Sequence, residues 1–222
     1  MRYSVIIPVY NESESLKILY LRLSEVMLRL GEDYEIIFIN DGSDDTSLKI
    51  LESLPQGDSL VIINFAKNRG QSIAYQEGIQ KARGEIIITL DADLQNDPSD
   101  IPHLIRKLEE GFDVICGWRK SRRDPFLTKI LSRIANITRR LLLKEKLHDV
   151  NCSLRAYRKK SLAGIDFSHN MYYMLTAILA QRGYRMGEVE VKHYPRKLGK
   201  TKFNVGKRMM LTKTLFRFLR NY

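Results

Sequence analysis

The sequence predicts an open, doubly wound α/β sheet with helices on both faces, and three observations support that prediction. Short β-branched runs alternate with helical patterns over the first 120 residues, as in chains built from β-α-β units. The central runs, IIFI, VIINF and IIITL, are continuously apolar, which is typical of parallel strands buried on both faces. With 222 residues, 44% of them hydrophobic, the chain is long enough for one domain with a sizeable core.

The expected elements follow one another regularly in the first half of the chain. Strands are expected at Ser4–Val9, Glu35–Ile39, Leu60–Phe65, Glu85–Leu90 and Asp113–Gly117. Helices are expected between them, at Glu14–Leu30, Asp45–Leu54, Ser72–Ala82 and Ser99–Glu110. The second half is expected to contain a basic helix over 121–148, a strand over 151–157, a helix over 170–183, a strand over 186–193, a loop over 194–202 and a final helix over 204–221.

The charge of the chain narrows its partners. Lys and Arg number 37 against 26 Asp and Glu, a net charge of +11 that suits nucleic acid, anionic lipid headgroups or a phosphorylated substrate. Most of the surplus lies in residues 117–160 and 192–220. A nucleic-acid-binding module is disfavoured, because no basic strand carries interleaved aromatic residues and no recognition-helix pattern occurs.

Two further features bear on the compartment. No run approaches the ~18 consecutive apolar residues of a membrane span, and the first ten residues fit a strand better than a secretion signal. The two cysteines have neither the number nor the spacing of a disulfide framework or a zinc site. A reducing, cytoplasmic compartment is therefore expected.

Polar turns follow the first four strands: 10–12, 40–43, 67–70 and 91–93. In doubly wound sheets, ligands bind outside the carboxyl ends of the strands, so these four turns are predicted to form one site. The first turn lacks G-x-G-x-x-G, which disfavours a dinucleotide. Tyr10 beside an acid could cover a nucleoside and Asp41 could accept a hydrogen bond from a base. The alternative is that both turns simply cap helices.

The strongest signal is Asp91-Ala92-Asp93-Leu94-Gln95, directly after the run IIITL. Two carboxylates one turn beyond a strand can converge on a cation, and Mg²⁺ commonly bridges one or two carboxylates to substrate phosphates. Asp93 and Gln95 are the candidate ligands, with Asp91 either holding a sugar or supporting the metal ligands from behind. The alternative is an Asx-rich turn in which one Asp caps the helix that starts near Ser99.

Together, PVYNE, NDGSDDTS, KNRGQSIAYQEGIQKARGE, LDADLQNDP, GWR and a late RKLGKTK resemble the family 2 glycosyltransferases with a GT-A fold. The similarity runs from about Tyr3 to Phe203 and is strongest to the dolichol-phosphate mannosyltransferase and polyprenyl-phosphate glycosyltransferase branch. It implies a metal-dependent, inverting enzyme that uses Mg²⁺ or Mn²⁺. That enzyme would move a hexose, mannose or glucose, from a GDP-mannose or UDP-glucose type of donor to dolichyl or undecaprenyl phosphate. Asn40 departs from the pattern, since many members have Asp there, and this weakens any inference about the base.

The resemblance also implies a role for each matching position. Nucleoside contacts would come from Pro8, Tyr10, Glu12, Ile39 and Asp41. Asp91 and Ala92 would contact the donor, and Asp93 and Gln95 would bind the metal. Arg119 would meet phosphate, while Arg196 and Lys202 would lie on a loop that closes over the donor diphosphate. The residues expected to carry catalysis are Asp91, Asp93, Arg119, Arg196 and Lys202. The chain is expected to be one GT-A domain over 1–222, with a nucleotide-sugar half at 1–118, an acceptor half at 119–203 and an amphipathic helix at 204–222.

The acceptor decides the subclass. A phosphate monoester is already anionic at pH 7, so it needs cations to hold it, and Arg119 and Arg133 are the candidates. Transfer to a hydroxyl on a saccharide, the alternative reaction, needs a general base, for which Asp149 is the candidate. The competing interpretation of Asp149 is an ion pair with Arg155.

Two segments suggest contact with a membrane. Leu211, Leu215, Phe218 and Leu219 recur at helical spacing with basic residues opposite, and the stretch from Phe126 to Leu143 has a similar apolar stripe. Such helices can lie in the interface of an anionic membrane; the alternative is packing against the domain core. A peripheral location at the cytoplasmic face is expected. A separate membrane anchor subunit is a further candidate partner.

Overall fold

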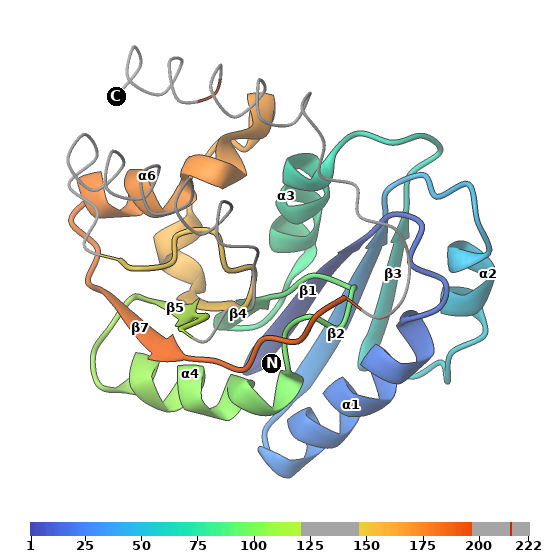
Figure 1. Ribbon diagram of the computed structural model, residues 1–222, viewed down its shortest axis with the longest axis horizontal. Coiled ribbons are helices and arrows are strands. Elements are labelled where there is room, and N and C mark those ends of the chain that lie inside the picture. The colour runs from blue at the N-terminus through green and yellow to red at the C-terminus, as the bar shows by residue number, and fades with distance from the viewer. Residues whose placement is uncertain (121–146, 197–213, 215–222) are drawn as a thin grey trace.

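The computed structural model describes residues 1–120, 147–196 and 214, and these form a layered α/β domain (Figure 1). The described strands build one seven-stranded sheet in the order β3-β2-β1-β4-β6-β5-β7. Their bounds are Tyr3–Val9 (β1), Tyr34–Asn40 (β2), Leu60–Asn64 (β3), Ile86–Thr89 (β4), Val114–Trp118 (β5), Arg155–Arg158 (β6) and Met186–Glu190 (β7). All neighbours are parallel except β6, which runs antiparallel to both β4 and β5. The predicted doubly wound, mostly parallel sheet is confirmed.

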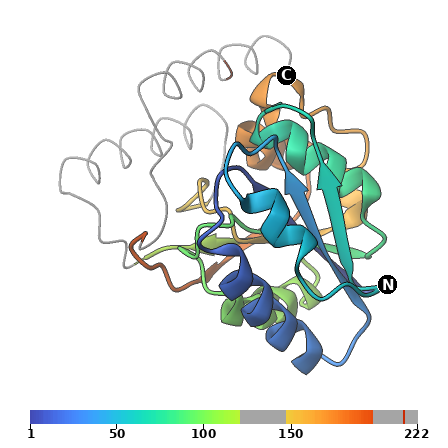
Figure 2. The ribbon, with the colours of Figure 1, turned by 90° about the vertical axis from the view of Figure 1, so that its right-hand side faces the viewer.

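Helices cover both faces of the sheet (Figures 1 and 2). The α-helices are Leu16–Arg29 (α1), Ser47–Glu52 (α2), Gln71–Lys81 (α3), Ile101–Glu109 (α4) and Leu175–Gln181 (α6), and the 3₁₀ helices are Pro98–Asp100 (η1), Lys159–Leu162 (η2) and Ser168–Met174 (η3). One core joins α1 and α4 to one face, and a second joins α3, η3 and α6 to the other. Alternate residues of β1 point into opposite cores, since Val5 and Ile7 belong to the first and Ile6 to the second.

Helix α3 lies close to the sheet because it presents a glycine there. A Cβ on Gly78 would meet Ile6 Cγ2 at 2.5 Å and Ile39 Cδ1 at 2.9 Å. This close approach matters for the site, because the first residue of α3 reaches the carboxyl edge of the sheet.

The second half differs from the expected elements. The helix expected over 170–183 is broken into η3 and α6, with His169 (φ 54°) and Asn170 (φ 65°) in left-handed conformation. The strand expected over 151–157 begins only at Arg155, and the strand expected over 186–193 ends at Glu190. The helices expected over 121–148 and 204–221 fall almost wholly outside the described residues. Within the described part of the chain, no helix has the length and apolar character needed to cross a membrane.

Candidate active site

The first two polar turns lie side by side at the carboxyl edge of the sheet, because Val9 at the end of β1 pairs with Asn40 at the end of β2. Hydrogen bonds join them in both directions. The Asn11 N–H donates to Ser43 Oγ (3.0 Å), and the Asp44 N–H donates to Asn11 Oδ1 (2.8 Å). Tyr10 OH donates to Asp44 Oδ2 at 3.2 Å, which holds the tyrosine ring over the second turn. The prediction that these turns meet is confirmed.

Asp41 fixes the third turn against the second. Its Oδ1 accepts from the Arg69 N–H (2.7 Å) and its Oδ2 from the Gly70 N–H (3.0 Å), and burial raises the pKa of this carboxyl. Gly42 makes the approach possible: its φ is +64°, and a Cβ there would lie 2.4 Å from the backbone of Lys67 and Asn68. Asp41 therefore has a structural role at the start of α3.

Two of the residues expected around a nucleoside are part of the fold itself. The Ile39 side chain is fully buried under α3, so it presents no side-chain surface to a ligand. Pro8 is partly buried near the end of β1.

Glu12 forms an ion pair with Arg196, and the side chains of Glu12 and Arg196 are 10% and 16% exposed. The predicted arginine from the late RKLGKTK motif thus reaches the first turn, whereas Lys202 and Arg133 lie outside the described residues.

The fourth turn carries the carboxylates of Asp91 and Asp93. Asp91 Oδ1 accepts hydrogen bonds from Gln71 Nε2 (2.7 Å) and Tyr75 OH (3.3 Å), and its backbone N–H donates to Ser153 Oγ at 3.3 Å. Ala92 between the two acids is buried in the core. The turn after Asp93 is tight, since its Oδ1 accepts from the Gln95 N–H at 3.2 Å. The residue between them, Leu94, has a φ of 58°.

The alternative interpretation holds in part: Asp93 forms an Asx turn with the Gln95 N–H, but neither Asp91 nor Asp93 caps the following helix. The residue that caps the helical segment after the turn is Asp97, whose Oδ1 accepts from the Ser99 N–H at 3.0 Å. Asp91 and Asp93 therefore do not serve as the N-cap of this helical segment.

The donor set of this turn fits a hard divalent cation. Burial, and after it the neighbouring charge of Asp91, raise the pKa of Asp93 to about 6, so a bound cation would stabilise the ionised form of this carboxyl. Gln95 adds an amide oxygen on the same turn, while its Nε2 donates to the Tyr194 carbonyl at 3.3 Å. Within 1–120, 147–196 and 214, no three His, Cys, Asp or Glu side chains group as a metal cluster. A carboxylate and an amide oxygen on one turn are ligand types that suit Mg²⁺ shared with substrate phosphates.

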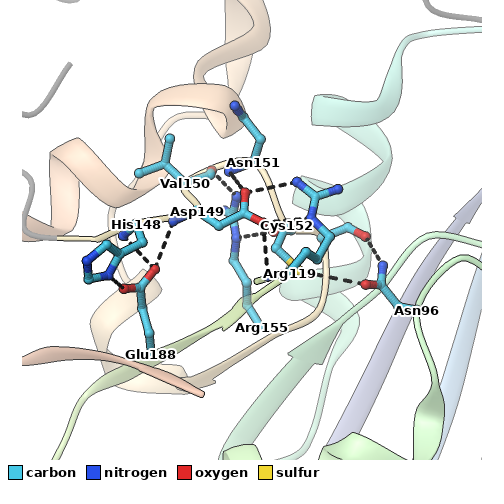
Figure 3. A network of polar contacts seen from close by, with 10 residues as sticks. Asn96, Arg119, His148, Asp149, Val150, Asn151, Cys152, Arg155 and Glu188 are labelled. Atoms are coloured by element: carbon cyan, nitrogen blue, oxygen red, sulfur yellow. Dashed lines mark hydrogen bonds and ion pairs between the residues drawn. The ribbon is translucent and has the colours of Figure 1, made fainter. Parts of the chain in front are cut away.

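Arg119 and Asp149 form a buried ion pair beside this turn (Figure 3). Arg119 Nε donates to Asp149 Oδ2 (2.7 Å) and Nη2 to Oδ1 (2.9 Å), and the two side chains are only 10% and 12% exposed. Although burial opposes it, the guanidinium holds the pKa of Asp149 below its usual range. A carboxylate stabilised in this way is a weak general base.

The alternative interpretation, in which Asp149 forms an ion pair with Arg155, is wrong in its partner, because Arg155 is engaged elsewhere. Arg155 Nε and Nη2 donate to the carbonyls of Cys152 and Val150, both at 2.7 Å, and Nη1 donates to Tyr157 OH at 3.2 Å. Arg155 is buried in β6 and braces the loop that carries Asp149.

Three supporting residues had no signal in the sequence. Glu188 of β7 accepts from the N–H groups of His148 (2.7 Å) and Asp149 (2.9 Å), so it holds the loop in place (Figure 3). Asn96 donates through Nδ2 to Ser153 Oγ at 2.9 Å, and Ser153 Oγ also accepts from the Asp91 N–H. Asn96 and Ser153 thereby tie the Asp91 turn to the Asp149 loop. The residues are 57 positions apart, and their pairing was not predictable without the sheet order.

Comparison with known sequences agrees with this architecture. The Glycosyl transferase family 2 model matches residues 4–165, so the chain belongs to this family. It is 36% identical over 208 residues to undecaprenyl-phosphate 4-deoxy-4-formamido-L-arabinose transferase of Serratia proteamaculans (strain 568), covering 93% of this chain and 64% of that protein. It is also 36% identical over 213 residues to dodecaprenyl-phosphate galacturonate synthase of Rhizobium johnstonii, covering 93% and 63%. The chain thus spans slightly less than two thirds of these curated relatives.

Solved structures show that the fold is the GT-A fold expected from the motifs. A mannosyltransferase from Pyrobaculum calidifontis, in complex with GDP-Man and Mn²⁺, superposes with a TM-score of 0.69 at 19% identity, covering 100% of this chain and 65% of that one. Glucosyl-3-phosphoglycerate synthase from Mycobacterium tuberculosis, in complex with Mn²⁺, UDP and phosphoglyceric acid, gives 0.73 at 16% identity, covering 98% and 78%.

Proposed function

We propose that this chain is the catalytic domain of a metal-dependent, inverting glycosyltransferase that moves a sugar from a nucleotide-diphosphate sugar to a polyprenyl phosphate. The observation that carries the proposal is the adjacent pair of carboxylates, Asp91 and Asp93, at the carboxyl end of β4 in a family 2 fold. The relatives named for undecaprenyl and dodecaprenyl phosphate support the choice of acceptor.

The donor lies across the four joined turns. The nucleoside binds between Tyr10 and Asp41, with Glu12 beside it and Pro8 at the floor, while Ile39 packs in the core beneath. Each Asp41 oxygen already accepts one backbone hydrogen bond and keeps a second lone pair for a base N–H. The sugar lies toward Asp91 and Ala92.

Asp93 and Gln95 hold Mg²⁺ or Mn²⁺, which supplies positive charge to the leaving diphosphate. Mn²⁺ occurs with nucleotide ligands in the mannosyltransferase and synthase structures, and Mg²⁺ occurs with UDP in another structure of the synthase, which supports this assignment. Arg196, held on Glu12, and Lys202 add fixed cations on the loop that closes over the diphosphate. Charges placed in advance where negative charge develops lower the barrier without reorganisation.

Arg119 and Arg133 hold the acceptor phosphate, and Asp149 orients Arg119. A phosphate oxygen of the acceptor attacks the anomeric carbon as the bond to the diphosphate breaks, and this single displacement inverts the configuration. No proton needs to leave the nucleophile, which agrees with the lowered pKa of Asp149 and its engagement with Arg119. Asp149 would have to leave this ion pair to serve as the base for a hydroxyl acceptor.

The domain works at the cytoplasmic face of the membrane, where its acceptor is embedded. The basic surplus in 117–160 and 192–220 supports peripheral association with anionic lipid. The whole of 1–222 acts as one domain, with its donor half at 1–118, its acceptor half at 119–203 and a membrane-facing helix at 204–222; an anchor subunit could hold it there. A hexose, mannose or glucose, stays the predicted sugar, although the relatives are named for a formamido-arabinose and a galacturonate.

A two-phase transfer assay tests this function. Purified protein is incubated with Mn²⁺ or Mg²⁺, a short polyprenyl phosphate and labelled GDP-mannose, UDP-glucose, UDP-galacturonate or a UDP-linked formamido-arabinose. We expect label to enter the organic phase with one donor and to be lost with EDTA. Label that enters only a water-soluble saccharide product would refute the lipid acceptor. Lipid labelling that survives EDTA would refute the metal.

A further inference from the structure

Asp91 lies at the end of a short chain of side-chain hydrogen bonds that starts far away in the sequence. Tyr173 OH donates to Gln71 Oε1 at 3.0 Å, and Gln71 Nε2 donates to Asp91 Oδ1 at 2.7 Å. Tyr173 and Gln71 are 102 residues apart. Tyr173 also lies beyond residue 165, where the match to the family model ends.

The amide of Gln71 fixes the donor-to-acceptor order of these hydrogen bonds. A carboxylate only accepts hydrogen bonds, whereas a glutamine side chain has one donating end and one accepting end. Because the Tyr173 hydroxyl occupies Oε1, the NH₂ end of Gln71 is turned toward Asp91. If the hydroxyl were absent, the amide could turn over and set its oxygen against the carboxylate, which is repulsive.

Gln71 and Tyr173, the two residues that lead to Asp91 in this series of hydrogen bonds, are each held by well-packed elements. Gln71 is the first residue of α3 and follows Gly70, whose N–H donates to Asp41 Oδ2. The start of this one helix therefore holds the carboxylates of both Asp41 and Asp91. On the other side, Tyr173 belongs to η3. Its neighbour Tyr172 stacks on Tyr75 with ring centroids 3.9 Å apart and donates to Thr89 Oγ1 at 3.3 Å.

We propose that Gln71 and Tyr173 are positioning residues that orient Asp91 toward a hydroxyl group of the donor sugar. The inference rests on the proposed function, in which the sugar lies beside Asp91. Asp91 turned in this way accepts a hydrogen bond from the sugar and makes no contact with the nucleoside. The chain from Tyr173 therefore contributes to recognition of the sugar, while the nucleoside diphosphate is bound independently of it.

Calorimetric binding without any acceptor tests the proposal. The wild type is titrated, in the presence of Mn²⁺, with UDP-glucose, UDP-galacturonate and GDP-mannose, and the tightest of the three is kept together with its UDP or GDP. The variants are Gln71→Met, Tyr173→Phe and the double variant. Tyr184→Phe is the matched control, because it also removes a tyrosine hydroxyl, one that lies near the Lys160 carbonyl at 3.5 Å.

We expect Gln71→Met to weaken nucleotide-sugar binding by about 10-fold or more, as for a lost hydrogen bond to a charged group. Tyr173→Phe should weaken it by a smaller factor. Neither variant should change binding of the nucleoside diphosphate by more than about twofold, since the chain ends on Asp91. The double variant should be no weaker than Gln71→Met, because Tyr173 acts through Gln71.

Equal losses for the nucleotide sugar and the nucleoside diphosphate would overturn the proposal, because a general disturbance of the site would explain them. Losses that multiply in the double variant would also overturn it. If Gln71→Met or Tyr173→Phe fails to fold, Gln71→Glu decides: it keeps the shape but cannot donate to Asp91, and unchanged sugar binding would refute the proposal. A wild type that binds nucleotide sugar but labels no lipid would refute only the proposed acceptor.

Discussion

The buried pair of Arg119 and Asp149 allows the most quantitative prediction. Asp149→Asn keeps the size of the side chain but leaves the Arg119 guanidinium buried without a carboxylate. Breaking a buried ion pair by removing one partner costs about 3–5 kcal/mol, and we expect about 3 kcal/mol because the side chains retain 10% and 12% exposure. In a chain of this size, that loss lowers Tm by roughly 6–12 °C.

Thermal unfolding followed by circular dichroism at pH 7 measures this loss. Lys120→Gln is the matched control, because it removes an ion pair with Glu190 in which both side chains are more than half exposed. Exposed pairs contribute about 0–1 kcal/mol, so the control should unfold close to the wild type. Combining Asp149→Asn with Arg119→Met should cost clearly less than the sum of the single changes.

The difference in stability between wild type and Asp149→Asn should depend on pH with a definite sign. The pKa of Asp149 is lowered by folding, so its stabilising contribution is complete above the unfolded value of about 3.9. It disappears as the pH falls through the folded value, and wild type and Asp149→Asn should converge below about pH 4. A variant within about 0.5 kcal/mol of wild type at pH 7 would refute the reasoning, as would a gap that widens in acid.

Three further predictions concern the site and the core. Asp93→Ala should abolish metal-dependent sugar transfer, because it removes a carboxylate proposed to hold the cation; steady-state rates across a Mn²⁺ titration check this, and wild-type kinetics would exclude Asp93 as a ligand. Lys202→Ala should reduce kcat by about 10²-fold if its charge stabilises the leaving diphosphate, as single-turnover rates would show, whereas a purely structural loop would leave kcat intact. Gly78→Ala should cost about 1–3 kcal/mol in denaturant unfolding, because the new methyl lies 2.5 Å from Ile6 Cγ2, while Gly57→Ala, with nothing within 4 Å, should be close to neutral.

Residues whose position follows from the nearest strand or turn in the sequence were predictable. The apolar strands and their polar carboxyl ends follow from composition and periodicity, and parallel pairing then brings Asn11, Asp41 and Asp91 to one edge. For Ile39, which the family resemblance implies near the nucleoside, the motif alone did not show the direction of the side chain. Ile39 is adjacent to the site in sequence, yet strand alternation turns its side chain into the core beneath Gly78.

Contacts that depend on the sheet order were not predictable in the same way. Arg155 follows Asp149 closely along the chain, but β6 runs antiparallel between β4 and β5 and carries Arg155 into the interior. Arg119, at the end of β5, takes its place 30 residues away. The break at His169 and Asn170 was likewise hidden, because the apolar spacing around it suits one continuous helix. The segment carrying Tyr173 begins directly after that break.

The ion pair also changes which experiment separates the two acceptor classes. On the sequence alone, Asp149→Asn would be silent for a phosphate acceptor and severe for a hydroxyl acceptor. Since Asp149 orients Arg119, the same change should impair both reactions. A test based on the acceptor itself is cleaner.

The most direct measurement compares two acceptors that differ only in the attacking group. Wild-type protein, its preferred labelled nucleotide sugar and Mn²⁺ are supplied with a polyprenyl phosphate or with the polyprenol of the same chain length. The account predicts lipid-linked sugar from the phosphate alone, with the inverted anomeric configuration seen by NMR. Transfer to the polyprenol at a comparable rate would contradict it, because a hydroxyl would then be the nucleophile and a general base would be required.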